Sequence, residues 1–156
     1  MALFRRPVRP LDDGTYAIEL GEAERGLVRS TVDQLADLLH QTDSPALRRL
    51  FPPPYGDDVE RNDGWAALAM PELIESRLAS LALVTESIEE TVLDEDGLDA
   101  WMRSINDVRL VLGTVLDIDD DEAPIEVDES NAATYQAYEI LGRLLETIVI
   151  ARSERL

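Results

Sequence analysis

An apolar stripe at helical spacing runs through the middle of the sequence and constrains the fold more than any other feature. Its members recur at alternating intervals of three and four residues: Leu98, Trp101, Ile105, Val108, Leu112 and Val115. This spacing places the side chains on one side of a helix, whereas a strand would alternate apolar and polar residues. The stripe therefore predicts one long core helix, which ends at an acidic run over residues 117–122.

Further stripes predict two helices before this one and one after it. The first covers residues 22–40, and the second begins with Pro71 in its first turn and carries a stripe that ends at Val92. The third follows a cap at Asp128 or Ser130. These segments are long enough to form the walls of a helical bundle.

The segment between residues 40 and 71 is more broken. Ser44 and Pro45 are typical of the N-cap and first turn of a short helix. Asp57 or Asp58 is suited to cap another short helix, but Gly64 is expected to interrupt it, because glycine disfavours helix interiors.

Residues 1–20 predict a β-hairpin around a turn at residues 11–14, where Asp and Gly tolerate positive φ. The first strand is expected over residues 2–8, and the second alternates Tyr16, Ile18 and Leu20 with less apolar residues. A two-stranded hairpin is marginal alone, so this apolar face needs a cover. The helices of the chain are one source of cover, and a second copy in a two-fold homodimer is the other.

Together these elements predict a mainly α fold, a bundle of about five helices with a short N-terminal β-hairpin. The chain of 156 residues is expected to be a single domain over 1–156, with the hairpin in 1–20 and the bundle in 22–153. Gly113 and Gly142 lie inside two of the predicted helices, which indicates close packing at both positions.

The charge is strongly acidic, because 33 acidic residues face 14 basic ones, all of them arginine, for a net charge of -19. Such a field repels phosphates and anionic lipid headgroups, so we expect no nucleic-acid or membrane partner. Arg5, Arg6 and Arg9 form the one local basic patch, which is typical of a solvated tail. The lack of a signal-peptide pattern favours a cytoplasmic protein. Salt adaptation and a GC-rich genome both remain open as the origin of the acidic, lysine-free composition.

The sequence sets out no cofactor site. It contains no cysteine, which excludes disulfides and thiolate chemistry in this chain. Asp117, Asp119 and Asp121 match the first three ligand positions of a calcium loop, but Glu122 stands where that loop needs glycine. A solvated acidic connector is the favoured interpretation, with a weak divalent-cation site as the alternative.

His40 is the only histidine and falls at the end of the helix over residues 22–40, where the helix dipole favours an imidazolium. No nearby residue indicates a catalytic partner for it. We therefore expect a C-terminal capping position and predict no catalytic residue.

A cluster of polar residues lies on the central helix: Arg103, Asn106, Asp107 and Arg109. Spacings of four residues predict ion pairs of Arg103 with Asp99 and with Asp107. Where the last helix covers this face, we expect a structural polar contact with tyrosine side chains of that helix. A ligand pocket is the less favoured alternative.

Phe51, Tyr55, Trp65 and the prolines at 52–54 form an aromatic corner between helices. The corner is either a packed cap on the core or a surface for a partner, since aromatic residues are enriched at interfaces. Its exposure decides between the two.

Three blocks of the sequence carry a resemblance to a known family. They are residues 47–52 (LRRLFP) with Tyr55, residues 101–114 (WMRSINDVRLVLGT) and residues 135–142 (YQAYEILG). As a set they resemble domain of unknown function family 2017, small proteins of high-GC Gram-positive bacteria. The resemblance implies a cytoplasmic, mainly helical protein without assigned catalytic residues. It also implies a loose regulatory role and, for some relatives, a link to Clp-type proteolysis.

The sequence therefore favours a non-enzymatic regulatory or protein-interaction module. It lacks a glycine-rich phosphate loop and a spaced set of metal ligands. The alternative is a small-molecule or divalent-metal enzyme, because helical bundles can build active sites from distant carboxylates.

Overall fold

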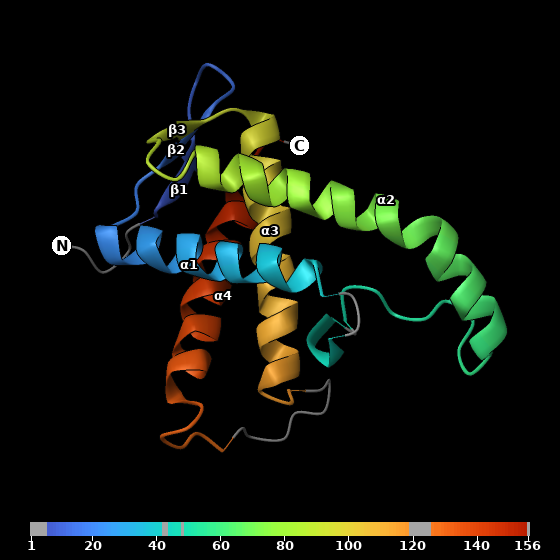
Figure 1. The fold of residues 1–156 in the computed structure, drawn as a ribbon. Helices are drawn as coiled ribbons and strands as arrows, with labels where there is room; N and C mark the ends of the chain where they lie inside the picture. Colours follow the sequence, from blue (N-terminus) through green and yellow to red (C-terminus); the bar gives the residue numbers. More distant parts are fainter. Residues whose placement is uncertain (1–5, 42–43, 48, 119–125, 156) are drawn as a thin grey trace.

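The computed structural model describes residues 6–41, 44–47, 49–118 and 126–155. Within them, four α-helices stand against a small three-stranded sheet (Figure 1). The helices are α1 (Glu22–Leu39), α2 (Val59–Glu86), α3 (Glu95–Val115) and α4 (Ala132–Ser153), with one 3-10 helix, η2 (Pro45–Leu47). The strands are β1 (Val8–Pro10), β2 (Tyr16–Ile18) and β3 (Val92–Leu93). The predicted mainly α fold with an N-terminal hairpin is confirmed, with four α-helices in place of about five.

The sheet is antiparallel and has β2 at its centre, between β1 and β3. Val8 pairs with Ile18, and Tyr16 pairs with Leu93. The first strand lies later than predicted, at 8–10, and residues 2–5 are outside the described part. β3 was not predicted, because two residues are too few to show an alternating pattern. Tyr16 and Ile18 are fully buried within the chain, so the hairpin face needs no second copy to cover it.

Helix α3 forms the centre of the molecule and contacts α1, α2 and α4. Its predicted stripe is buried from Leu98 to Val108 and continues to half-buried Leu112. Val115, at the end of the stripe, is 60% exposed. The helix begins at Asp94, whose carboxylate accepts a 2.7 Å hydrogen bond from the backbone N–H of Gly97. This cap satisfies one of the free N–H groups of the first turn.

Helix α2 is a single helix, where the sequence predicted two segments. Asp58 caps it by accepting a 3.1 Å hydrogen bond from the Arg61 N–H. Gly64 does not interrupt the helix, because a cost of about 1 kcal/mol is too small against the hydrogen bonds of the flanking turns. Pro71 lies inside the helix rather than at its start. A proline removes one hydrogen bond and bends a helix, and Figure 1 shows α2 bending in its N-terminal half.

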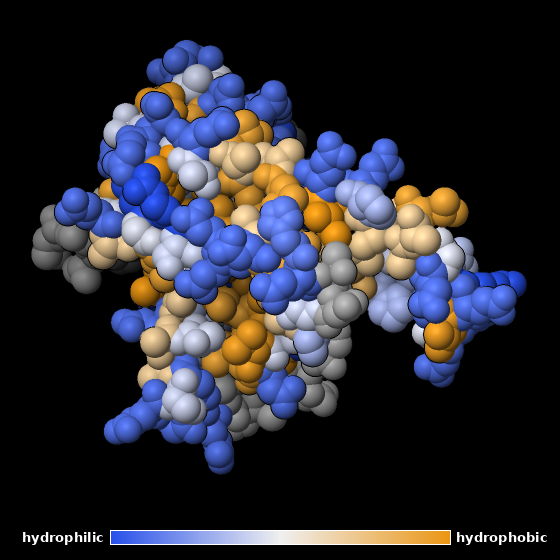
Figure 2. Space-filling view, in the orientation of Figure 1, coloured by the Kyte–Doolittle hydropathy of each residue, from blue (hydrophilic) through white to orange (hydrophobic). Residues whose placement is uncertain are grey.

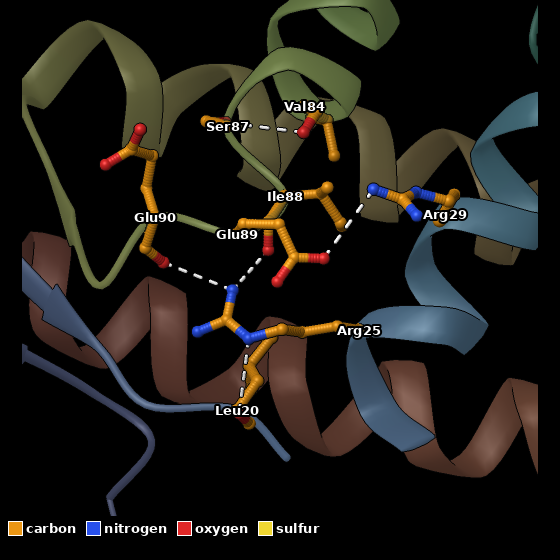
Figure 3. A network of polar contacts seen from close by, with 8 residues as sticks. All are labelled: Leu20, Arg25, Arg29, Val84, Ser87, Ile88, Glu89 and Glu90. Atoms are coloured by element: carbon orange, nitrogen blue, oxygen red, sulfur yellow. Dashed lines mark hydrogen bonds and ion pairs between the residues drawn. The ribbon is translucent and has the colours of Figure 1, made fainter. Parts of the chain in front are cut away.

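The predicted stripe of α2 was also too long at its C-terminal end, because the helix ends at Glu86 and Val92 belongs to β3. Arg25 of α1 holds the turn that follows (Figure 3). Its guanidinium donates to the carbonyls of Ile88 and of Glu90, the latter at 3.1 Å, and to the carbonyl of Leu20 at 3.2 Å. One arginine thereby joins α1, the end of β2 and the turn after α2.

The remaining helix ends differ little from expectation. His40 is the C-cap of α1, as predicted, and is exposed to solvent. The N-cap of α4 is Asn131 rather than Asp128 or Ser130. Asp128 organises the turn before it by accepting hydrogen bonds from the N–H groups of Ser130 and Asn131.

Candidate functional site

The polar residues of α3 face different neighbours. The carboxylate of Asp107 is buried and lies 3.0 Å, through both oxygens, from Nη1 of Arg77 on α2. Burial raises the pKa of Asp107 above its ordinary value of 3.8, and the charge of Arg77 opposes that rise. Arg103 donates to Ser80 Oγ at 3.5 Å and also acts on Asp107 through its charge. Asp107 is thus engaged by a neighbouring helix.

The acidic side chains of α3 pair with other partners than those that helical spacing predicts. Asp99 accepts a 2.9 Å hydrogen bond from Arg152 of α4, and Glu95 pairs with the same arginine at 2.6 Å. The hydrogen-bonding partner of Asp107 is Arg77, in place of the predicted Arg103. Contacts between helices have therefore replaced pairs along one helix.

Arg109 faces α4 instead. Its guanidinium carbon lies 4.3 Å from the centre of the Tyr138 ring, a cation–π contact. A Cβ added to Gly142 would lie 3.1 to 3.2 Å from this guanidinium. At Gly113, an added Cβ would lie 2.8 Å from Nη1 of Arg49. Other side chains therefore pack closely against both glycines, and in each case the nearest one is an arginine.

The predicted cluster does not form one site. Asn106 is exposed, Asp107 and Arg103 face α2, and Arg109 faces α4. These directions follow from 100° of rotation per residue around a helix. The cluster therefore joins α3 to its two neighbours.

Most of the acidic run over residues 117–122 lies outside the described residues. Asp117 is exposed and has a positive φ of 57°. Asp119 and Asp121 lie outside the described residues. Across the described ranges, no group of three or more His, Asp or Glu side chains stands close enough to hold a metal ion.

The two most exposed large apolar side chains among the described residues lie on the N-terminal part of α2, residues 59–71, which we name the arm. Figure 1 shows the arm projecting away from the other helices, and Figure 2 shows apolar residues on that projection. Leu68 is 86% exposed and Val59 is 69% exposed. From residue 64 to residue 71 the arm carries no charged side chain. A projecting helix with this composition is typical of a contact surface.

The aromatic corner is divided between core and arm. Phe51 is half-buried and packs against the core, whereas Tyr55 is 47% exposed beside the arm. An open hollow of about 400 Å³ lies over the arm, and its lining comprises Tyr55, Arg61, Gly64, Trp65 and Leu68. Arg61 lies 5.7 Å from the centre of the Tyr55 ring, which places a charge at the edge of this apolar surface. The sequence indicated Tyr55 and Trp65 but not Leu68, because an exposed leucine has no signature in sequence.

Among the described residues, no helix is both long enough and apolar enough to pass through a membrane.

Comparison with known proteins places this mainly helical protein in a family. The model of the domain of unknown function DUF2017 matches residues 4–151, so the chain belongs to this family. This confirms the resemblance that the three sequence blocks carried.

A curated relative comes from Mycobacterium leprae (strain TN) and is named "Putative oxidative stress regulator AosR". It is 29% identical over 128 residues, which are 70% of this chain and 58% of that protein. The chain thus spans little more than half the length of this relative. No solved structure matches the chain.

Proposed function

We infer that this chain is a non-enzymatic regulatory module of the cytoplasm that acts by binding protein, with the arm as its contact surface. One observation carries the proposal: Leu68 is 86% exposed at the centre of an uncharged stretch of helix that projects from the molecule. Exposed apolar side chains that cluster on a projection gain free energy when a partner removes them from water.

The surroundings of the arm support this assignment. Acidic residues at 57, 58, 60 and 63 precede the uncharged stretch, and two more at 72 and 75 follow it. An apolar centre with a charged rim is the usual anatomy of a protein interface. The hollow beside Trp65 offers space for one side chain of a partner.

The name of the Mycobacterium leprae relative supports the regulatory part of the proposal. The absence of cysteine limits how this chain would take part in an oxidative response. A thiol switch needs a thiolate, so any regulation by this chain operates through contacts rather than through its own cysteine chemistry.

Affinity purification from the native host tests the proposal. The wild-type chain is compared with Leu68→Glu, which places a charge at the centre of the arm. The matched control is Val149→Glu, which also replaces an apolar side chain with glutamate, at a 47% exposed position on α4. We expect a reproducible protein partner for wild type and the control, lost with Leu68→Glu. The purified Clp adaptor is included as a named candidate partner, because the family resemblance implies that link.

A thermal-shift screen against metals and metabolites tests the enzyme alternative in parallel. Ligand binding to the native state raises the melting temperature by mass action. A shift of several degrees from one compound, accompanied by turnover, would contradict the proposal. Capture that is equal for wild type and Leu68→Glu would remove the arm as the contact surface.

A further inference from the structure

We propose that the partner of the arm is the arm of a second copy of this chain, packed antiparallel about a two-fold axis at Leu68. The inference rests on the proposed function, since both assign the arm as the contact surface. It adds the identity of the partner and the register of the contact.

The arm and the turn of α2 that follows it carry a seam that suits such a pairing. Three exposed residues of α2 recur at intervals of seven: Arg61, Leu68 and Glu75. Seven residues are almost two helical turns, with a drift of about 20° per interval, so the three side chains share one face. Trp65 and Glu72 lie on the same face by the same rotation.

An antiparallel pairing centred on Leu68 brings opposite charges together. Each residue faces the one that lies equally far from position 68 on the other side. Arg61 therefore faces Glu75 of the second copy, and the symmetry repeats this pair. Leu68 faces its own equivalent across the axis, and an isologous contact of this kind closes as a dimer.

In the same register Glu72 faces Gly64 of the second copy, and Trp65 faces Pro71. A Cβ added at Gly64 would meet nothing within 4 Å, so the space there is open. Helices with small residues at the contact approach more closely, near the short end of the 8–10 Å range of axial separations.

Charge disfavours the parallel pairing and the antiparallel pairing that is centred on Glu72. A parallel pairing sets Arg61 against Arg61 and Glu75 against Glu75. An antiparallel pairing with the axis at Glu72 sets two glutamates against each other. Like charges directly opposed are destabilising, so the axis at Leu68 is the register that the sequence of the arm favours.

The overall charge is compatible with self-association at moderate salt. Each chain carries a net charge of -19, which opposes association. At about 0.15 M salt the Debye length is about 8 Å, so charges elsewhere on the two molecules are largely screened. The uncharged stretch 64–71 places few of the charges at the contact itself.

Sedimentation velocity on the full chain over the micromolar range, in about 0.15 M salt, tests the inference. We expect a monomer–dimer equilibrium for wild type. Arg61→Glu and Glu75→Arg should each weaken the dimer about tenfold, because each replaces an attraction with a repulsion twice in the dimer. The double variant Arg61→Glu/Glu75→Arg should restore wild-type association. Asp63→Arg, a charge change of the same size on the side of the helix away from the seam, is the matched control.

Crosslinking provides a readout that does not depend on affinity. The chain has no cysteine, so Leu68→Cys introduces the only thiol. The axis brings the two copies of position 68 together, and mild oxidation or a short bis-maleimide should yield a covalent dimer. Ala82→Cys, on the exposed side of α2, should yield none. It lies 14 residues from the axis, so at a 1.5 Å rise the two copies stand about 42 Å apart.

The outcomes are separable. A monomer at every concentration, no rescue by the double charge reversal, or equal crosslinking at positions 68 and 82 would each overturn the inference. If Leu68→Glu abolishes capture of another protein while the wild-type chain sediments as a monomer, the proposed function stands and the self-association fails. Circular dichroism of each variant confirms that it is folded.

Discussion

Arg77 Nη1 on α2 lies 3.0 Å from both carboxylate oxygens of Asp107 on α3. Asp107 is only 2% exposed, so this contact is the main hydrogen-bonded compensation for a buried negative charge. A rotation of α2 that moved Arg77 away would leave that charge unpaired in the core. The pair therefore specifies how the C-terminal half of α2 crosses α3.

Arg77→Met should destabilise the fold by about 3 kcal/mol, because removal of one member of a buried pair leaves the other uncompensated. Urea unfolding followed by circular dichroism measures the change. Arg29→Met is the matched control, since Arg29 and Glu89 form an exposed pair at 3.7 Å and should contribute less than about 0.5 kcal/mol. Equal losses for the two variants would mean that the buried pair has no special role.

The stability contributed by Asp107 should depend on pH. Burial raises its folded-state pKa above the ordinary 3.8, so the folded protein holds this proton to higher pH than the unfolded chain does. Stability from this group is therefore greatest below 3.8 and falls as the pH rises through the raised pKa.

Asp107→Asn removes this titration. The difference in unfolding free energy, wild type minus variant, should decrease as the pH rises from the ordinary pKa toward neutrality. Urea unfolding of both proteins at a series of pH values measures it. A difference that increased with pH would show that Arg77 outweighs burial.

Arg25→Ala should destabilise the protein by about 2 to 3 kcal/mol, because charge-assisted hydrogen bonds to the carbonyls of Leu20, Ile88 and Glu90 are lost together. Hydrogen exchange should increase first in the turn after α2 and at β3. Loss of stability with no change in exchange there would contradict the assignment of Arg25 to this turn.

Gly142→Ala should have opposite effects in two backgrounds. In wild type the new methyl group displaces the Arg109 guanidinium from Tyr138, with an expected cost of about 1 kcal/mol. In Arg109→Ala the obstruction is gone, and the same change should stabilise the helix by about 0.5 to 1 kcal/mol through propensity.

A double-mutant cycle by thermal or urea unfolding gives the coupling between positions 109 and 142. Gly26→Ala on α1, where an added Cβ meets nothing within 4 Å, is the control and should stabilise in both backgrounds. The absence of coupling would show that Arg109 moves aside without cost.

Those parts of the fold that depend on local interactions were predictable from the sequence. The stripe from Leu98 to Val108 implied a buried face. The cap at Asp94 is a local interaction too, because a capping carboxylate needs only an N–H group three residues away. His40 at the end of α1 follows the same local logic. Gly113 and Gly142 indicated close packing, although not the arginines that fill the space.

Tertiary structure decided what no local pattern contains. The partner of Asp107 lies 30 residues away on α2, and a carboxylate on an isolated helix has no means of choosing it over Arg103. Pro71 continues a helix because the turns on both sides are held elsewhere, by the Asp58 cap and by core contacts of residues such as Leu81. The exposure of Leu68 likewise depends on whether other segments of the folded chain cover it. Local hydrogen bonds determine where helices begin, whereas burial and the pairing of buried charge depend on which segments meet in space.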